Sequence, residues 1–401
     1  MATLPSILVT LSGRDYPGIS ESLFAALAPL DLTVADIEQI QVHGRLLLCV
    51  ELAGSNGVCP PVESVGELVE RGFSAAHPDV AVTVTELDAP DARRSGARQL
   101  VTVLAPAFDP ALLARVFGQI AACGANVDRI VRLSHYPVAS YELAVSGGDA
   151  AVLRRELGLV AADLGVDVAV QRAGLHRRAK HLIVLDADST LLQGEVIDML
   201  AAKVGCEDEV AAITAAAMAG ELDFAAALRQ RVALLEGLDE GVLTDLGRQL
   251  LLAPGARTLV RTLKRLGYVT AVVSGGFVQV ITELMADLGI DHVAANQLEV
   301  RAGKVTGRLA GPVVDRAGKA DALRQIAEQS GVPLTQTVAV GDGANDIDML
   351  ATAGLGIAYN ARPIVRDAAD TALSVPYLDA ILFLLGISRE EIEAADSEYP
   401  V

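Results

Sequence analysis

The chain has 401 residues, of which 52% are hydrophobic and 21% are charged, and its formal net charge is -19 at pH 7. This length and composition predict about two to four domains with packed cores and exclude a largely disordered chain. Because so acidic a surface repels phosphate backbones and anionic lipids, we expect no nucleic-acid partner and no membrane partner.

The cysteines and the apolar segments bear on the cellular compartment. Four cysteines are spread through the chain without a CxxC pair, which is typical of reduced thiols. The first residues, MATLPSILVTLSG, lack the pattern of a signal peptide, and no run of about 18 apolar residues predicts a transmembrane helix. We therefore expect a cytoplasmic protein.

The first part of the chain repeats one order of elements. Apolar patterning predicts strands at 7–12, 33–42, 45–53 and 79–86, and helices at 17–30 and 60–76. The order then restarts, with strands at 100–105, 125–134, 138–146 and 166–172, and helices at 110–123 and 149–164. A βαββαβ order is that of the ferredoxin-like fold, and the polar segment 88–98 is expected to link the two copies.

The pattern changes after a second polar segment at 173–180. Short apolar strands are predicted at 181–186, 268–274 and 337–342, with helices such as 256–266 and 319–329 between them. Strands that alternate with helices indicate a Rossmann-like, doubly wound parallel sheet. The helical segment at about 195–250 is too long for a simple crossover, and we expect it to form a cap.

Each of the three predicted parallel strands ends in polar residues. They are Asp186 and Asp188 at the end of the first strand, Ser274 and Gly275 at the end of the second, and Asp342, Asn345 and Asp346 at the end of the third. Lys319 opens the helix that precedes the third strand. Because ligands of open α/β sheets bind outside the carboxyl ends of the strands, these side chains are expected to surround one site.

These residue types suit phosphoryl chemistry with Mg²⁺. Asp186 and Asp188 would be costly to bury without a cation or hydrogen bonds, and Mg²⁺ prefers carboxylate ligands. An aspartate held by a metal can also attack phosphorus and form an aspartyl phosphate. Each element alone has a plainer interpretation: the aspartates as a turn with a helix N-cap, Ser274 and its glycines as a turn, and Lys319 as a surface lysine.

The four elements in this order resemble the haloacid dehalogenase superfamily, whose pattern is DxDx[TV], then Ser or Thr, then Lys, then GDxxxD. The resemblance covers about residues 181–375. Asp188, the second aspartate of the first element, is typical of the phosphatases and phosphomutases of that superfamily.

Four longer strings are similar to the phosphoserine phosphatase family: DADSTLLQGEVID, AAAMAGELDFAAALRQRVALLEGL, VVSGGF and VAVGDGANDIDML. That resemblance implies that Asp186 is the nucleophile and that Asp188 is the general acid and then the base. It also implies that Mg²⁺ is held by Asp186, Asp342 and the backbone carbonyl of Asp188, that Asp346 orients this metal site, and that Ser274, Gly275 and Lys319 bind the phosphoryl group.

The same resemblance assigns the recognition of the substrate to the cap. Glu195 would bind the ammonium group of phosphoserine, and Arg231 would pair its planar fork with the carboxylate. Phe224 and Met218 would pack over the small side chain, and Asn345 would hydrogen-bond the substrate. The plainer alternatives are an exposed acid in the first turn of a helix, a solvated arginine and ordinary core residues.

The front half resembles tandem ACT domains, which are βαββαβ modules that bind amino acids. The stretch GRDYPGIS at 13–20 matches the loop between the first strand and the first helix of that module. Gly18 would let a ligand carboxylate approach free N–H groups at the helix start, and Asp15 would bind its ammonium. The second repeat has Phe108 and Ala111 at the aligned positions. Both repeats could instead serve assembly alone.

The sequence therefore predicts an ACT domain at 1–88, a second at 99–173, and a phosphatase core at 180–390 with a helical cap at about 195–250. The expected activity is Mg²⁺-dependent hydrolysis of O-phospho-L-serine, the last step of serine biosynthesis, by a homodimer that serine regulates. Two alternatives stay open. One is a phosphatase of another small phosphomonoester, and the other is an ACT amino-acid sensor whose phosphatase half is vestigial.

Overall fold

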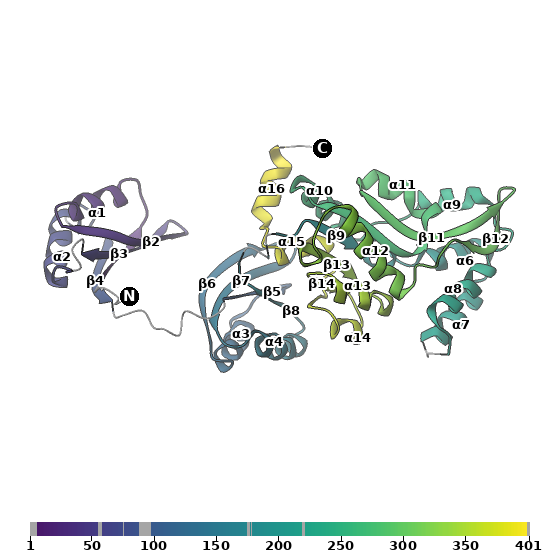
Figure 1. Ribbon diagram of the computed structural model, residues 1–401. Coiled ribbons are helices and arrows are strands. Elements are labelled where there is room, and N and C mark those ends of the chain that lie inside the picture. The colour runs from purple at the N-terminus through teal and green to yellow at the C-terminus, as the bar shows by residue number, and fades with distance from the viewer. Residues whose placement is uncertain are drawn as a thin grey trace. The chain divides into compact units, whose positions relative to one another are not determined.

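The computed structural model describes residues 6–54, 58–74, 76–87, 98–174, 177, 179–218 and 221–398. The chain divides into two compact units, Met1–Ser95 and Gly96–Val401, and Figure 1 labels their helices and strands in chain order. Except for Arg98, the predicted linker 88–98 lies outside the described residues.

The first unit contains a four-stranded antiparallel sheet in the order β2-β3-β1-β4. Its strands are β1 (Ser6–Arg14), β2 (Leu32–Val42), β3 (Arg45–Gly54) and β4 (Val80–Leu87), and its helices are α1 (Ile19–Leu27) and α2 (Val62–Val69), which a further turn, Glu70–Ser74, extends. Alternate residues of β1, namely Ile7, Val9 and Leu11, are buried in a core with the helices. The helix α1 starts later than predicted because Gly18 precedes it in a left-handed conformation, with φ 99°.

The second unit begins with the same order of elements. These are β5 (Gln99–Ala105), α3 (Pro110–Ala122), β6 (Ala125–Ser134), β7 (Ala139–Gly147), α4 (Ala150–Leu164) and β8 (Asp167–Arg172). Their sheet has the order β6-β7-β5-β8, which repeats the order of the first unit element by element. The predicted duplication of a ferredoxin-like fold is therefore confirmed.

A seven-stranded sheet in the order β12-β11-β10-β9-β13-β14-β15 forms the rest of the second unit. Its strands are β9 (Leu182–Leu185), β10 (Val269–Phe277), β11 (His292–Arg301), β12 (Lys304–Ala310), β13 (Thr337–Gly341), β14 (Gly356–Tyr359) and β15 (Thr371–Leu373). All neighbours are parallel except β11 and β12. The predicted doubly wound parallel sheet is confirmed.

The central strand β9 is buried on both faces. Ile183 and Leu185 pack in the core with α10 (Ala256–Arg265) and α11 (Val278–Leu288), whereas Leu182 and Val184 pack in the core with α12 (Arg316–Gln329) and α13 (Ile347–Thr352). Burial on both sides explains why its sequence is uniformly apolar instead of alternating.

Four helices follow the first parallel strand, within the predicted helical segment 195–250. They are α6 (Val196–Val204), α7 (Glu207–Met218), α8 (Phe224–Ala233) and α9 (Glu240–Gly247). The antiparallel strand β12, which the sequence did not predict, contacts α8. Within the described residues, none of the helices combines the length and the apolar character that a membrane span requires.

The second βαββαβ repeat is attached to the seven-stranded sheet by a shared core. Leu104 and Ala169 of the repeat belong to one apolar cluster with Ile381 of α15 (Ile381–Leu384). Asp167 of β8 accepts a hydrogen bond of 2.6 Å from the backbone N–H of Ser374, next to the edge strand β15. The two elements therefore form a single packed body within the second unit.

Arg177, in the segment between β8 and β9, contacts both the second repeat and α15. Its side chain is 6% exposed, forms a salt bridge with Glu142 of β7, and donates a hydrogen bond of 3.2 Å to the backbone carbonyl of Leu384 at the end of α15. Because Glu142 is itself only 17% exposed, Arg177 supplies the cation that its carboxylate contacts in a region largely shielded from water.

Arg177→Ala should destabilise the second unit by about 3–5 kcal/mol, because it leaves a buried carboxylate without its partner. Denaturant unfolding followed by circular dichroism would measure the loss. Arg115→Ala is the matched control, since Arg115 and Asp163 are 53% and 65% exposed and such pairs contribute about 1 kcal/mol or less. A loss for Arg177→Ala no larger than that of the control would show that the packing of the repeat on α15 does not depend on this pair.

Candidate active site

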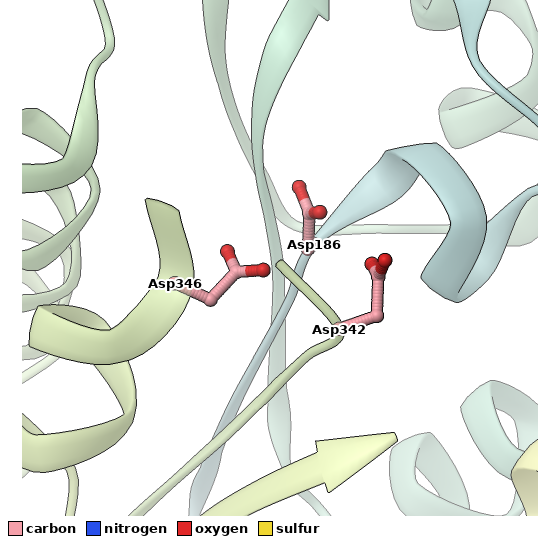
Figure 2. Close-up of side chains that lie close together, drawn as sticks. All are labelled: Asp186, Asp342 and Asp346. Atoms are coloured by element: carbon pink, nitrogen blue, oxygen red, sulfur yellow. The ribbon is translucent and has the colours of Figure 1, made fainter. Parts of the chain in front are cut away.

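The site lies where the carboxyl ends of β9, β10 and β13 meet. A cavity of about 760 Å³ opens there, and nine of the predicted site residues line it: Asp186, Asp188, Glu195, Phe224, Arg231, Gly275, Lys319, Asp342 and Asn345. Figure 2 shows Asp186, Asp342 and Asp346 close together, with Asp186 after β9 and the other two in the segment that follows β13. Sequence positions as far apart as 186 and 342 thus converge on one edge of the sheet.

A buried lysine joins two of the aspartates. Lys319 is fully buried in the first turns of α12, and its Nζ lies 2.6 Å from Asp186 Oδ1 and 2.7 Å from Asp346 Oδ1. Burial lowers the pKa of Lys319, but the two carboxylates more than offset it, so the pKa is raised and the ammonium stays charged. The plainer interpretation of Lys319 as a surface lysine is wrong.

Asp186 ends β9 and is 4% exposed. Burial and the charge of Asp346 raise its pKa well above the usual value, while Lys319 acts in the opposite direction. One ammonium therefore does not neutralise the local negative charge. An additional cation nearby would therefore stabilise the charged form of this buried carboxylate.

Asp188 is held by the turn that follows β9. Its Oδ1 accepts a hydrogen bond of 2.8 Å from the N–H of Val196, and its Oδ2 accepts one of 3.2 Å from the hydroxyl of Ser274. Ser189 adopts a left-handed conformation, with φ 57°, which turns the chain sharply between the two aspartates and the cap. Burial, followed by the charge of Glu195, raises the pKa of Asp188 to about 7.

The loop after β13 supplies two further carboxylates. Asp342 Oδ1 accepts a hydrogen bond of 2.8 Å from Thr190, and burial raises its pKa to about 6. Both oxygens of Asp346 are engaged, one by Lys319 and the other by the N–H of Gly343 at 2.9 Å. Gly341 is required here, because a Cβ atom would lie 2.4 Å from Asp346 Cγ.

The three carboxylates fit a divalent cation. Oxygens of Asp186, Asp342 and Asp346 lie within 4.8 Å of one another. Hard oxygen donors in a partly buried site with excess negative charge are the ligands of Mg²⁺, which keeps several waters and few carboxylates. Because the oxygens of Asp346 are already hydrogen-bonded, Asp186 and Asp342 are the carboxylates with oxygens left for a metal.

The turn at the end of β10 lets the chain approach a ligand closely. The hydroxyl oxygen of the buried Ser274 accepts a hydrogen bond of 2.8 Å from the N–H of Gly276. A Cβ atom on Gly276 would lie 2.8 Å from Asp188 Oδ2, and one on Gly275 would lie 3.2 Å from Phe224 Cζ. The space available therefore disfavours any side chain at Gly276, whereas a side chain at Gly275 would require Phe224 to shift slightly.

The cap contributes one cation and one anion to the cavity. Arg231 of α8 is partly buried, and its Nε atom is buried without a hydrogen-bond partner among the described residues. Burial lowers the pKa of Arg231, and Glu195 raises it. Glu195 is exposed at the N-cap position of α6 and accepts a hydrogen bond of 2.9 Å from Ser189. Met218 ends α7, and its side chain lies outside the described residues.

Some lining residues were not predicted. Arg316, Asn360 and Arg362 border the same cavity. Arg316 starts α12 and pairs with Asp348, and Asn360 directly follows β14. Asn360 could have been predicted, because ligands bind at the carboxyl ends of parallel strands, but the sequence analysis did not recognise β14 as a strand.

A second cavity, of about 500 Å³, lies in the first unit at the start of α1. Asp15, Gly18, Gln39 and Gln41 are among its lining residues. Gln41 Nε2 donates a hydrogen bond of 2.6 Å to Asp15 Oδ2. The two ligand-binding residues predicted for the first ACT domain thus border one hollow.

Comparison with known families agrees with this geometry. Residues 183–351 match the haloacid dehalogenase-like hydrolase family, and residues 6–67 and 98–171 each match an ACT domain family. A hydrolase of that family from Salmonella enterica has a similar structure, with a TM-score of 0.64 at 26% identity, over 72% of this chain and 98% of the other. The structure of a probable phosphoserine phosphatase from Vibrio cholerae gives 0.57 at 31% identity, over 78% and 92%.

Relatives of known name extend over nearly the whole chain. The phosphoserine phosphatase of Streptomyces coelicolor is 51% identical over 98% of this chain and 95% of its own length. The phosphoserine phosphatase of Mycobacterium tuberculosis is 49% identical over 98% and 96%. Since the identity spans both ACT domains as well as the catalytic part, the chain is an enzyme of the phosphoserine phosphatase family, a haloacid dehalogenase-like hydrolase that follows two ACT domains.

Proposed function

We propose that the protein hydrolyses O-phospho-L-serine to L-serine and phosphate, with Mg²⁺, through an aspartyl phosphate on Asp186. The observation that carries the proposal is the presence of Arg231 and Glu195 in the same cavity as Asp186 and Lys319. A cation and an anion suit the carboxylate and the ammonium of an amino acid, and the carboxylate–lysine cluster suits a phosphoryl group.

The proposed reaction has two half-reactions, in which Asp186 forms and breaks a bond to phosphorus and Asp188 transfers the protons. A carboxylate oxygen of Asp186 bonds to phosphorus as the bond from phosphorus to the serine oxygen breaks, and Asp188 gives its proton to that oxygen. In the second half, Asp188 takes a proton from water, the water oxygen bonds to phosphorus, and the bond to Asp186 breaks. The raised pKa of Asp188, about 7, supports both roles, because each protonation state is accessible near neutral pH.

The remaining side chains bind and orient. Ser274, Gly275 and Lys319 would hold the phosphoryl oxygens, and Asn345 would hydrogen-bond the substrate. Phe224 would cover the small side chain together with Met218. Asp186, Asp342 and the backbone carbonyl of Asp188 would hold Mg²⁺, which would neutralise charge on the phosphoryl group. Asp346 would fix this arrangement through its hydrogen bonds with Lys319 and Gly343.

We also propose that serine binds the first ACT domain and lowers activity, in a cytoplasmic homodimer that completes serine biosynthesis. The cavity at Asp15 and Gly18 supports an amino-acid site. An apolar patch supports assembly: Ile40 lies directly opposite Leu47 in the β2–β3 ladder, and Ile40, Val42 and Leu47 are 53%, 57% and 42% exposed.

Substitution of the two motif aspartates tests the mechanism. Asp186→Asn should lower kcat about 1,000-fold or more, because an amide is a poor nucleophile. Asp188→Asn should lower kcat/KM, which reports only the formation of the aspartyl phosphate, about 100-fold or more for phosphoserine, and much less for p-nitrophenyl phosphate, whose leaving group departs without a proton. Asp198→Asn, in the same cavity, is the control. Equal losses for both substrates in Asp188→Asn would contradict its role as the general acid.

Arg231→Ala tests the substrate. The variant should lower kcat/KM for phosphoserine about 100-fold, since the substrate carboxylate would lose a partly buried charged partner, but should leave p-nitrophenyl phosphate within about threefold. Arg229, exposed on the same helix, gives the matched control Arg229→Ala. If the wild-type enzyme turned over phosphothreonine or phosphohomoserine faster than phosphoserine, the proposed substrate would be wrong.

The regulatory site is tested at Asp15. Gly18 is a poor choice, because its φ of 99° is strained for any side chain, so a substitution would disturb the turn itself. Asp15→Asn keeps an acceptor for Gln41 but removes the negative charge for an ammonium, and should abolish inhibition by serine while turnover without serine is unchanged. Calorimetry with serine checks binding, and Asp36→Asn is the control. Undiminished serine inhibition in Asp15→Asn would place the effector elsewhere.

A further inference from the structure

An asparagine is buried in β11, outside every motif singled out in the sequence. Asn296 is 1% exposed, next to partly buried apolar neighbours in the strand. A primary amide in such a place is costly unless both its oxygen and its nitrogen find partners. Asn296 finds both on the backbone of two other segments, each of which leads to a group of the phosphoryl site.

The first partner is the Ser274–Gly275 turn. In the β10–β11 ladder, Ser274 pairs with Ala295 and Phe277 pairs with Asn296, so Gly275 and Gly276 are extra residues that bulge out of the sheet. The carbonyl of Gly275 accepts a hydrogen bond of 2.9 Å from Asn296 Nδ2. The side chain thus supplies the partner that the interrupted ladder does not.

The second partner is the segment that leads into α12. The N–H of Val314 donates a hydrogen bond of 2.8 Å to Asn296 Oδ1. Asp315, the next residue, caps α12, whose first turns place the fully buried Lys319 against Asp186. One amide therefore joins the turn that carries Ser274 to the start of the helix that carries Lys319.

We propose that Asn296 is a positioning residue of the phosphatase site, which sets the distance between the Ser274–Gly275 turn and Lys319. The turn belongs to β10 and Lys319 belongs to helix α12, and among the described residues no single motif residue is hydrogen-bonded to both. Misplacement of a binding group by about 1 Å costs about 100-fold in rate. The inference rests on the proposed phosphoryl transfer to Asp186, but not on phosphoserine as the substrate.

Asn296→Asp separates the two hydrogen bonds. A carboxylate still accepts from Val314 but sets an oxygen against the carbonyl of Gly275. We expect kcat to fall about 10- to 100-fold for both phosphoserine and p-nitrophenyl phosphate, and the inhibition constant of orthovanadate, which mimics the phosphoryl group in transfer, to rise about tenfold or more. KM for phosphoserine should change by less than about threefold, because Arg231 and Glu195 are untouched. Asn296→Ala, which adds no charge, should give the same pattern.

The matched control is Gln279→Ala. Gln279 also uses both ends of a partly buried amide on β11, donating to the carbonyl of Leu298 at 2.7 Å and accepting from its N–H at 3.2 Å, but it contacts neither phosphoryl element. It should lower the melting temperature and leave kcat within about twofold. All variants are assayed in the full chain, at a temperature where circular dichroism shows them folded.

Three outcomes would overturn the inference: folded Asn296 variants with kcat within about twofold of wild type, a loss equal to that of Gln279→Ala, or failure of both Asn296 variants to fold, which would make the residue structural only. A wild-type enzyme that prefers another phosphomonoester would refute the proposed substrate and leave the p-nitrophenyl phosphate result for Asn296 intact.

Discussion

The ammonium of Lys319, enclosed between Asp186 and Asp346, is the interaction on which the site depends. It brings a carboxylate at the end of β9 and another in the loop after β13 within hydrogen-bonding distance of one atom. Without this cation the carboxylates would repel one another in a region shielded from water. With it, the cluster still carries excess negative charge, which favours a further cation among Asp186, Asp342 and Asp346.

Sheet order makes this geometry possible. The strand β9 lies between β10 and β13 and is buried on both faces, so its end cannot shift without disturbing two cores. Gly276 and Gly341 then bring backbone so close to Asp188 and Asp346 that a Cβ atom would not fit, and Gly275 lies against Phe224. Buried strands fix the positions of the charged side chains, and the glycines allow the backbone to approach these side chains closely.

The sequence predicted those parts of the fold and site that depend on local signals. Strand ends, the doubled βαββαβ order and the motif residues follow from apolar patterning and from residues adjacent in the chain. Asn296 gave no such signal, because its hydrogen-bond partners, Gly275 and Val314, are brought near it only in the folded sheet. Arg177 was likewise indistinguishable from its charged neighbours until α15 and Glu142 were placed around it.

The two ACT repeats differ at the position that is expected to bind a ligand. In the second, Phe108 stands where Asp15 aligns and packs edge-on against Tyr141, with ring centroids 4.9 Å apart, so an apolar contact occupies the position of the charged group. The same repeat shares its core with α15 of the phosphatase part. The first repeat keeps Asp15 at an open cavity. A ligand there can change turnover only if it binds one state of the whole molecule better than another.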